Sequence, residues 1–267
     1  MIFLTKLFKP EHGENRMRNE GDVLSARTYF FTGKNNNLRF LLGERYRWMN
    51  RFISAGDCGI EVGCGTGVAK EFIEGTLLLT DFADYPWLDV PNVDALSTPF
   101  KDGEFDFVIA SNMIHHVARP KKFFQEMQRI LKPGGRLLIQ DVNASFFMRL
   151  ALHAMKHEGY DFSAPVFNES VICTDHDDLW SANCAIVNLL FDDLSNFERQ
   201  IDYFKVVEAD HSEFLMFLNS GGVVAKTFFI PLPRLVLRLV KWLDSLLVKS
   251  LPSIFAMQRQ IVLEKRI

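Results

Sequence analysis

Four short apolar runs follow one another along the first part of the chain, with helical patterns between them. The runs are CGIEVG at 58–63, TLLLTD at 76–81, FDFVIAS at 105–111 and RLLIQDV at 136–142. Each run is nearly continuous in apolar residues, which is typical of strands that are buried on both faces. Such strands, alternating with helices, predict an α/β fold built on a doubly wound, mostly parallel sheet.

Apolar residues at helical spacing predict the helices that accompany these strands. One helix is expected over 38–53, and another starts at Pro120 and ends at Pro133-Gly134-Gly135. Beyond 142 the pattern predicts a helix near 180–191, a strand near 203–209, a helix near 213–219, a long helix from Pro233 and a last strand at 259–265. The end of the chain is expected to pair back onto the sheet.

The length of 267 residues fits a single domain. Within it the patterns predict an N-terminal helical arm (1–53), a core (57–142), an insertion that caps the substrate (143–200) and a C-terminal strand–helix–strand unit that completes the sheet (201–267). Four aromatic residues of the insertion are expected to line the pocket: Phe146, Phe147, Tyr160 and Phe162.

Composition and charge narrow the functional classes. The chain is 48% hydrophobic with a net charge of -3, which excludes global disorder and disfavours a nucleic-acid partner. Its four cysteines form no C-x-x-C pair, so reduced thiols and a cytoplasmic location are expected. The start MIFLTKLF is too short for a secretory signal, and no run of about 18 uncharged apolar residues predicts a transmembrane span.

The segment IEVGCGTG at 60–67 places three glycines at every second position after the first strand. Ligands of parallel sheets bind where a strand turns into a helix. The spacing G-x-G-x-G differs from the dinucleotide motif G-x-G-x-x-G, and the lysine of a phosphate-binding loop is missing. The turn therefore predicts close approach of the backbone to a flat or compact ligand rather than a phosphate cradle.

At this point the sequence resembles the class I S-adenosylmethionine-dependent methyltransferases, in particular those with a type 11 methyltransferase domain. The resemblance rests on four segments in order: IEVGCGTG, TLLLTD, VDALSTPFKDGEFDFVIASNMIHHV (93–117) and LKPGGRLLIQDV (131–142). It implies a Rossmann-like sheet of seven strands, methyl transfer as the activity and S-adenosyl-L-methionine as the cofactor.

The resemblance also implies roles for individual residues. The turn 63–67 would run beneath the amino-acid part of the cofactor, with Glu61 helping to position it. Asp81 would accept hydrogen bonds from the ribose hydroxyls, while Asp94 and the backbone of Ala95 would hold the adenine. The residues assigned to the cofactor are Glu61, Gly63, Cys64, Gly65, Gly67, Asp81, Phe82, Asp94, Ala95, Asn112 and Met113.

His115 and His116 follow the fourth strand and are the catalytic candidates, as general bases near the methyl group. The alternative is that they pack and orient the loop. Two other groups could hold a metal ion: the pair His153 and His157 with the neighbouring Glu158, and the segment TDHDD at 174–178. Neither forms a convincing ligand set, and TDHDD also fits an N-terminal helix cap, so no metal is predicted.

The helix over 233–249 carries a narrow polar stripe of Arg234, Arg238, Lys241, Ser245 and Lys249, and most of its other residues are apolar. Such a helix is expected to bury its apolar face in the core. Covering the active site, forming a homodimer face or making a peripheral membrane contact through the basic stripe are the alternatives.

The predicted function is transfer of a methyl group from S-adenosylmethionine to an oxygen, less readily a nitrogen or carbon, of a small-molecule or saccharide-type acceptor. The segments VPNVDA and SGG…PLP and the long insertion resemble methyltransferases of bacterial glycan biosynthesis. Two alternatives remain open. One is a non-catalytic methyltransferase-like binding module, and the other is a nicotinamide-dependent oxidoreductase, which the glycine spacing disfavours.

Overall fold

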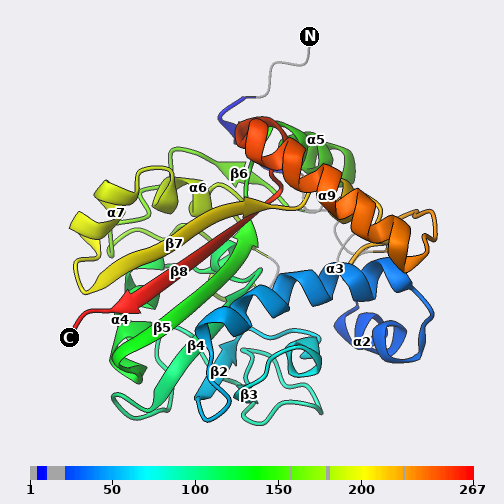
Figure 1. Cartoon of the computed structure of the whole chain (residues 1–267). Helices are drawn as coiled ribbons and strands as arrows, with labels where there is room; N and C mark the ends of the chain where they lie inside the picture. Colours follow the sequence, from blue (N-terminus) through cyan, green and yellow to red (C-terminus); the bar gives the residue numbers. More distant parts are fainter. Residues whose placement is uncertain (1–4, 11–21, 157, 179–180, 225) are drawn as a thin grey trace.

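A six-stranded sheet forms the centre of the computed structural model, which describes residues 5–10, 22–156, 158–178, 181–224 and 226–267 (Figure 1). In spatial order its strands are β3 (Thr76–Leu79), β2 (Cys58–Val62), β4 (Phe105–Ser111), β5 (Leu131–Val142), β8 (Gln258–Lys265) and β7 (Phe204–Ser212). The first four are parallel, and β8 runs antiparallel to both β5 and β7. The predicted mostly parallel α/β sheet is thereby confirmed.

The seventh strand expected from the family resemblance is reduced to a single bridge in the described part of the chain. Thr80 pairs with Val90 in parallel, just beyond the end of the edge strand β3. The chain around this bridge is compact: Val93 N–H donates to the Asp81 carbonyl over 2.8 Å. The segment around Val90 therefore takes the place of the seventh strand beside β3, but it forms only this one bridge in the described part of the chain.

Helices cover both faces of the sheet because the strands are apolar on both sides. On one face lie α4 (Pro120–Ile130), α6 (Ile186–Phe191) and α7 (Leu194–Gln200), whose buried residues include Phe123, Phe124, Ile186 and Phe197. On the other lie α2 (Val23–Thr32), α3 (Asn36–Arg47) and the 3-10 turn η1 (Trp48–Phe52). Figure 1 shows α3 crossing this second face.

The ends of two predicted helices differ from the expectation. Helix α4 ends at Ile130, and Leu131 already adopts extended backbone, so Pro133-Gly134-Gly135 lies inside β5 rather than ending the helix. The helix expected near 180–191 begins at Ile186; residues 179–180 lie outside the described residues. The segment TDHDD is therefore not the cap of this helix, which begins well after it.

A further layer lies beyond the carboxyl ends of the parallel strands (Figure 1). It contains α5 (Phe146–Met155), α8 (Leu215–Leu218), α9 (Arg234–Ser250), α10 (Pro252–Phe255) and the small antiparallel sheet of β1 (Leu7–Phe8) and β6 (Tyr160–Asp161). The four aromatic residues expected to line the pocket belong here. Phe147, Tyr160 and Phe162 pack in the core of this layer, and Phe146 is exposed with its ring edge on Phe147.

The proposed subdivision of the chain stays a prediction. Residues 143–200 include α5 and β6, which lie over the strand ends, but also α6 and α7, whose apolar side chains belong to the main core beside the sheet. This segment therefore contributes to the folding core as well as to the layer above the strand ends.

Among the described residues none covers the apolar face of helix α9 (Arg234–Ser250), contrary to the expectation of core packing. Its buried residues are Leu237, Asp244 and Val248, and Asp244 accepts hydrogen bonds from the backbone of the α8 turn. Away from these contacts six apolar residues of the helix are exposed: Leu235, Val236, Leu239, Trp242, Leu243 and Leu246. We call these six residues the α9 apolar face. None of the helices in the described ranges has the length and apolar character needed to cross a bilayer.

Candidate cofactor and acceptor site

A cavity of about 680 Å³ opens at the carboxyl ends of β2 and β4. It receives the glycine turn, the end of β3 and the loop that follows β4. The following predicted cofactor residues line it: Gly63, Cys64, Gly65, Asp81, Phe82, Asp94, Ala95, Asn112 and Met113. Glu61 and Gly67 lie behind this wall rather than on it. The structure therefore brings the assigned residues to one place, while their contact with a cofactor stays a prediction.

All three glycines of the turn have left-handed backbone, with φ of 63°, 49° and 62° at Gly63, Gly65 and Gly67. Only Gly65 faces open space, because a Cβ atom there would meet nothing within 4 Å. At Gly67 it would lie 2.8 Å from the Trp87 ring, and at Gly63 it would touch the Met113 side chain at 3.0 Å. The left-handed backbone explains why glycine stands at all three positions. The need to leave space for a ligand applies only to Gly65.

Glu61 is fully buried beneath the turn. Its Oε1 accepts a hydrogen bond from the Tyr46 hydroxyl over 3.0 Å, whereas Oε2 is buried with no hydrogen-bond partner in the described part of the chain. Burial, together with the charge of Asp81, raises the pKa of Glu61 to about 8 against the opposing effect of Tyr46. A buried oxygen without a partner is costly, and the raised pKa favours the protonated, uncharged carboxyl of Glu61 at neutral pH.

Asp81 braces the turn from the end of β3. Its Oδ2 accepts from Gly65 N–H over 2.8 Å and its Oδ1 from Ala83 N–H over 3.0 Å. Burial raises its pKa, partly opposed by these backbone hydrogen bonds. Each oxygen keeps a second lone pair, so Asp81 is able to hold the turn and a ligand hydroxyl at once.

Asp94 also lines the cavity and is partly exposed. Its Oδ1 accepts from Leu96 N–H over 2.8 Å, and Oδ2 lies 3.3 Å from Nε2 of His176. The His176 ring also meets the ring of Phe82 edge-on, with 5.5 Å between centroids. The TDHDD segment thus reaches the predicted adenine end, a placement that its sequence did not reveal.

The loop after β4 is fixed by a buried carboxylate that sequence reasoning missed. Asp141, at the end of β5, accepts from Met113 N–H at 3.1 Å and Ile114 N–H at 2.7 Å. Asn112 begins the loop with a φ of 53° and its side-chain oxygen accepts from Gln258. An acid at the end of a strand in the QDV segment was the only sequence signal for this role.

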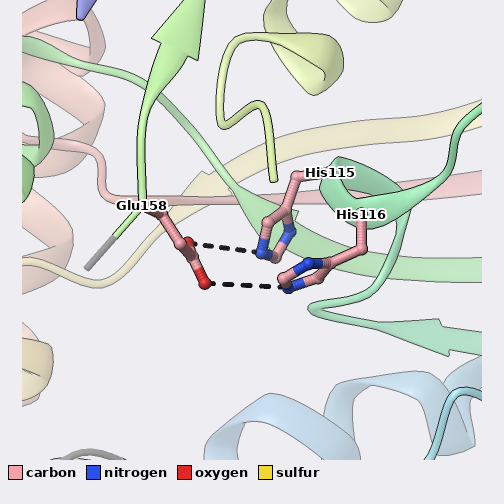
Figure 2. Close-up of side chains that lie close together, drawn as sticks. All are labelled: His115, His116 and Glu158. Carbon is pink, nitrogen blue, oxygen red and sulfur yellow. Dashed lines mark ion pairs between the residues drawn. The ribbon is translucent and has the colours of Figure 1, made fainter. Parts of the chain in front are cut away.

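His115 and His116 form the 3-10 turn η3 (Ile114–His116) and face the side chain of Glu158, as Figure 2 shows. The Nε2 atoms of the two rings lie 3.5 and 3.6 Å from the Oε2 and Oε1 atoms of Glu158. Nδ1 of His115 lies 2.5 Å from Asp141 Oδ1, and Nδ1 of His116 lies 3.0 Å from the Ser181 carbonyl oxygen. Glu158 comes from the segment between α5 and β6, so only the fold brings it to the histidines.

The two histidines differ in protonation. Burial opposes a charge on His115, but the carboxylates of Asp141 and Glu158 outweigh it and raise the pKa of His115 to about 10. Burial lowers the pKa of His116, and the charge of His115 lowers it further, to about 4. In the absence of another cation, His115 is therefore charged at neutral pH and His116 is neutral. His116 is the better general-base candidate of the two.

The remaining wall of the cavity is largely apolar. It comes from the end of β5, from α5 and from α8 with the segment after it, with Val142, Met148, Leu152, Phe217 and Val223 among its residues. Arg45 also reaches the wall, but its guanidinium is paired with both carboxylate oxygens of Glu213 over 2.8 Å. Polar groups of the cavity beside this apolar wall include the two histidines and Glu158.

Comparison with known proteins supports the family resemblance. Residues 60–139 match a family model described as a methyltransferase domain. A demethylmenaquinone methyltransferase of Renibacterium salmoninarum is 29% identical over 123 residues, which cover 40% of this chain and 52% of that protein. A ubiquinone/menaquinone biosynthesis C-methyltransferase of a Ruegeria species is 46% identical over 52 residues, 20% of this chain and 21% of that protein. The chain thus spans about half the length, or less, of these relatives.

A solved S-adenosylmethionine-dependent methyltransferase from Archaeoglobus fulgidus has the same fold. It superposes with a TM-score of 0.50 and 16% identity, over 91% of this chain and all of that one. This likeness supports the Rossmann-like α/β architecture of the whole described chain.

The cofactor of this family is S-adenosylmethionine, and the residues present fit it. The open space at Gly65 is one that a Cβ atom would fill, so the backbone of the turn is able to approach a ligand closely there. Asp81 retains lone pairs for hydroxyl donors. The matched segment, the sheet order and these residues agree: residues 60–139 are a methyltransferase domain of the class I S-adenosylmethionine-dependent type.

Proposed function

We propose that this chain transfers the methyl group of S-adenosylmethionine to a small-molecule acceptor with an apolar body. The observation that carries the proposal is that the cofactor residues and the apolar wall share one cavity, with the loop 112–116 between them. When bound, the cofactor supplies an electrophilic methyl group on its sulfonium. The task of the protein is then to align an acceptor atom with this group in a dry site.

We assign a separate role in this task to each group of residues. The turn at Gly65 and the carboxylates of Asp81 and Asp94 hold the cofactor, and the apolar residues of α5 exclude water from the acceptor side. His116, which is neutral at pH 7, is placed to take a proton from the acceptor. His115 is held in its charged form and orients Glu158 instead.

An oxygen remains the accepting atom that we propose. The names of two relatives give demethylmenaquinone and C-methylation for those proteins, so a carbon acceptor is the alternative. The saccharide-type acceptor suggested by the sequence stays a prediction, and the apolar wall favours it less than a hydrophobic molecule. A cytoplasmic location also stays a proposal, supported by four cysteines that are all free.

Calorimetry on the purified protein tests the cofactor assignment. S-adenosylhomocysteine should bind, whereas NAD should not, because the turn has no dinucleotide spacing. Binding of NAD without any response to S-adenosylhomocysteine would overturn the proposal. Binding of S-adenosylhomocysteine without turnover on any quinol, phenol or saccharide acceptor would instead favour a non-catalytic binding module.

We also propose that the α9 apolar face rests on a membrane surface. Arg238 and Lys249 lie exposed along one flank of this face, which suits anionic headgroups. Exposed Phe228 and Ile230 extend the apolar surface in the segment before α9. Helix α9 packs on α8, and Phe217 and Leu218 of α8 line the cavity. A hydrophobic acceptor would therefore have a short path from the membrane to the site; a homodimer formed through this face is the other outcome of the test.

A further inference from the structure

Three side chains from two separate segments converge beside the acceptor part of the cavity. His115 and His116 lie on η3, and Glu158 lies between α5 and β6 (Figure 2). One ligand atom from each lies within 4.8 Å of the others. We propose that His115, His116 and Glu158 bind a divalent transition-metal ion, with Zn²⁺ as the best match to two imidazoles and one carboxylate.

The distances suit such a site. Zinc binds imidazole nitrogen and carboxylate oxygen at about 2.0–2.2 Å, so two ligand atoms at a tetrahedral angle are about 3.4 Å apart. Nε2 of His115 lies 3.5 Å from Glu158 Oε2, and Nε2 of His116 lies 3.6 Å from Oε1. These separations are long for direct hydrogen bonds but close to the spacing of two atoms that share one ion.

A hydrogen bond at Nδ1 fixes the orientation of each imidazole ring. Nδ1 of His115 is held by the carboxylate of Asp141, and Nδ1 of His116 by the carbonyl oxygen of Ser181. An acceptor at Nδ1 places the proton there and leaves the lone pair on Nε2, directed at Glu158. Metal-binding histidines almost always make such a hydrogen bond through their other ring nitrogen. Asp141 is itself fixed by Met113 N–H and Ile114 N–H.

A cation between these groups also lowers their mutual repulsion. Two nitrogen lone pairs directed at one carboxylate repel it, and either a proton on Nε2 of His115 or a metal ion relieves this repulsion. If Nε2 of His115 carries a proton, that proton can interact with Oε2 of Glu158. The Nε2 lone pair of neutral His116 still points at Oε1 of Glu158. A single divalent ion satisfies both rings and both oxygens. The Cys184 thiol lies 3.2 Å from Glu158 Oε2 and donates to it, which helps to hold the carboxylate.

A site with three protein ligands keeps a position open, as catalytic zinc sites do. All three residues line the cavity, so the open position faces the acceptor side. An acceptor hydroxyl bound there would lose its proton to solvent more readily. This role rests on the proposed methyl transfer, and in it His116 is a ligand rather than a base. The metal site itself stands independently of that transfer.

Titration of chelator-treated protein with ZnCl₂ tests the inference. We expect one zinc per chain, with affinity reduced at least tenfold in Glu158→Gln and in His116→Ala. His176→Ala is the matched control: it removes the exposed histidine of TDHDD from the same cavity and should leave zinc binding unchanged. Zinc affinity should also fall as pH falls, since protons compete for the ligands. Equal zinc binding in wild type and Glu158→Gln would overturn the proposal, as would its loss only in His176→Ala.

Cobalt gives a second readout that needs no variant. Co²⁺ bound to the wild-type protein by two nitrogens and carboxylate oxygens should show the intense visible absorption of a four- or five-coordinate ion, and Zn²⁺ should displace it. A spectrum that matches aqueous Co²⁺ would contradict the site even if the variants failed to fold. Calorimetry with S-adenosylhomocysteine on the same samples separates the two proposals. Zinc binding without it would sink the methyltransferase function, and the reverse would sink the metal site.

Discussion

Asp141 and His115 are joined by a hydrogen bond of 2.5 Å in a fully buried environment. The same carboxylate accepts from the backbone of Met113, Ile114 and Val142. One side chain at the end of β5 therefore fixes both the loop after β4 and the orientation of the first histidine. The geometry of the acceptor side depends on this contact.

Replacing Asp141 by asparagine should destabilise the protein by about 2–4 kcal/mol, because an amide keeps only one acceptor and turns a donor toward buried N–H groups. Urea unfolding followed by circular dichroism measures the change. Asp84→Asn is the control, since Asp84 is exposed, and it should change stability by less than about 0.5 kcal/mol. Equal stability of the two variants would mean that Asp141 does not hold the loop.

The stability of metal-free protein should depend on His115 at high pH. Its pKa is about 10 in the folded protein, above the value of 6.5 for an unperturbed histidine. The stabilisation is therefore fully present below pH 6.5 and is lost as pH rises through 10. In the presence of chelator, wild type should lose more stability between pH 7 and pH 10 than His115→Gln does. Parallel stability curves for the two proteins would contradict the charged form of His115.

Asp81→Ala should weaken binding of S-adenosylhomocysteine at least about tenfold, which corresponds to about 1.4 kcal/mol. Two effects contribute: the loss of acceptors for the ribose hydroxyls and the loss of support for Gly65 N–H. Asp81→Asn should recover part of the affinity because its amide keeps one acceptor. Calorimetry measures all three proteins, and unchanged affinity in Asp81→Ala would remove Asp81 from the cofactor site.

Two glycines of the turn should respond differently. Gly65→Val should abolish binding of S-adenosylhomocysteine, because the new side chain enters open cavity space as well as a left-handed backbone position. Gly67→Val should mainly lower the melting temperature, since its side chain would collide with Trp87 and Leu79. Thermal melting and calorimetry on both variants check this contrast. Loss of binding with normal melting in Gly67→Val would place that residue in the cofactor site instead.

On α9, aspartate at an exposed position should leave the fold intact and reduce membrane contact. Leu239 is 56% exposed and Trp242 is 58% exposed, whereas Leu237 is 1% exposed. Leu239→Asp should change stability by less than about 1 kcal/mol and weaken binding to vesicles with anionic lipid. Leu237→Asp should cost several kcal/mol as a charge placed in a core. Vesicle sedimentation and denaturant unfolding provide the two measurements.

Light scattering, which measures the oligomeric state, distinguishes whether a membrane or a second copy of the chain covers the α9 apolar face. A wild-type dimer that Leu239→Asp converts to a monomer, together with no binding to vesicles, would show that this face is a dimer interface.

Local sequence determined the strands and the turn between β2 and η2 (Val68–Glu71). Strand β4 has five buried positions among its seven residues, and continuous apolar runs of this kind need no distant information to be recognised. The three glycines of the turn were also readable, because left-handed backbone favours glycine wherever it occurs. Asp81 and Asp94 followed from their places after the strands and from the family resemblance.

Only the tertiary structure decided which distant side chains meet. Glu158 lies far along the chain from His115 and His116, so its carboxylate reaches them only through the packing of the segment between α5 and β6. No spacing in the sequence predicts that contact, and from the sequence alone Glu158 is a candidate metal ligand only together with His153 and His157. The exposure of the α9 apolar face could not be predicted from the sequence for a related reason. Apolar periodicity marks a face that tends to leave water, but which surface covers that face is set by the neighbouring elements, and here α8, α10, β7 and α3 occupy the opposite side.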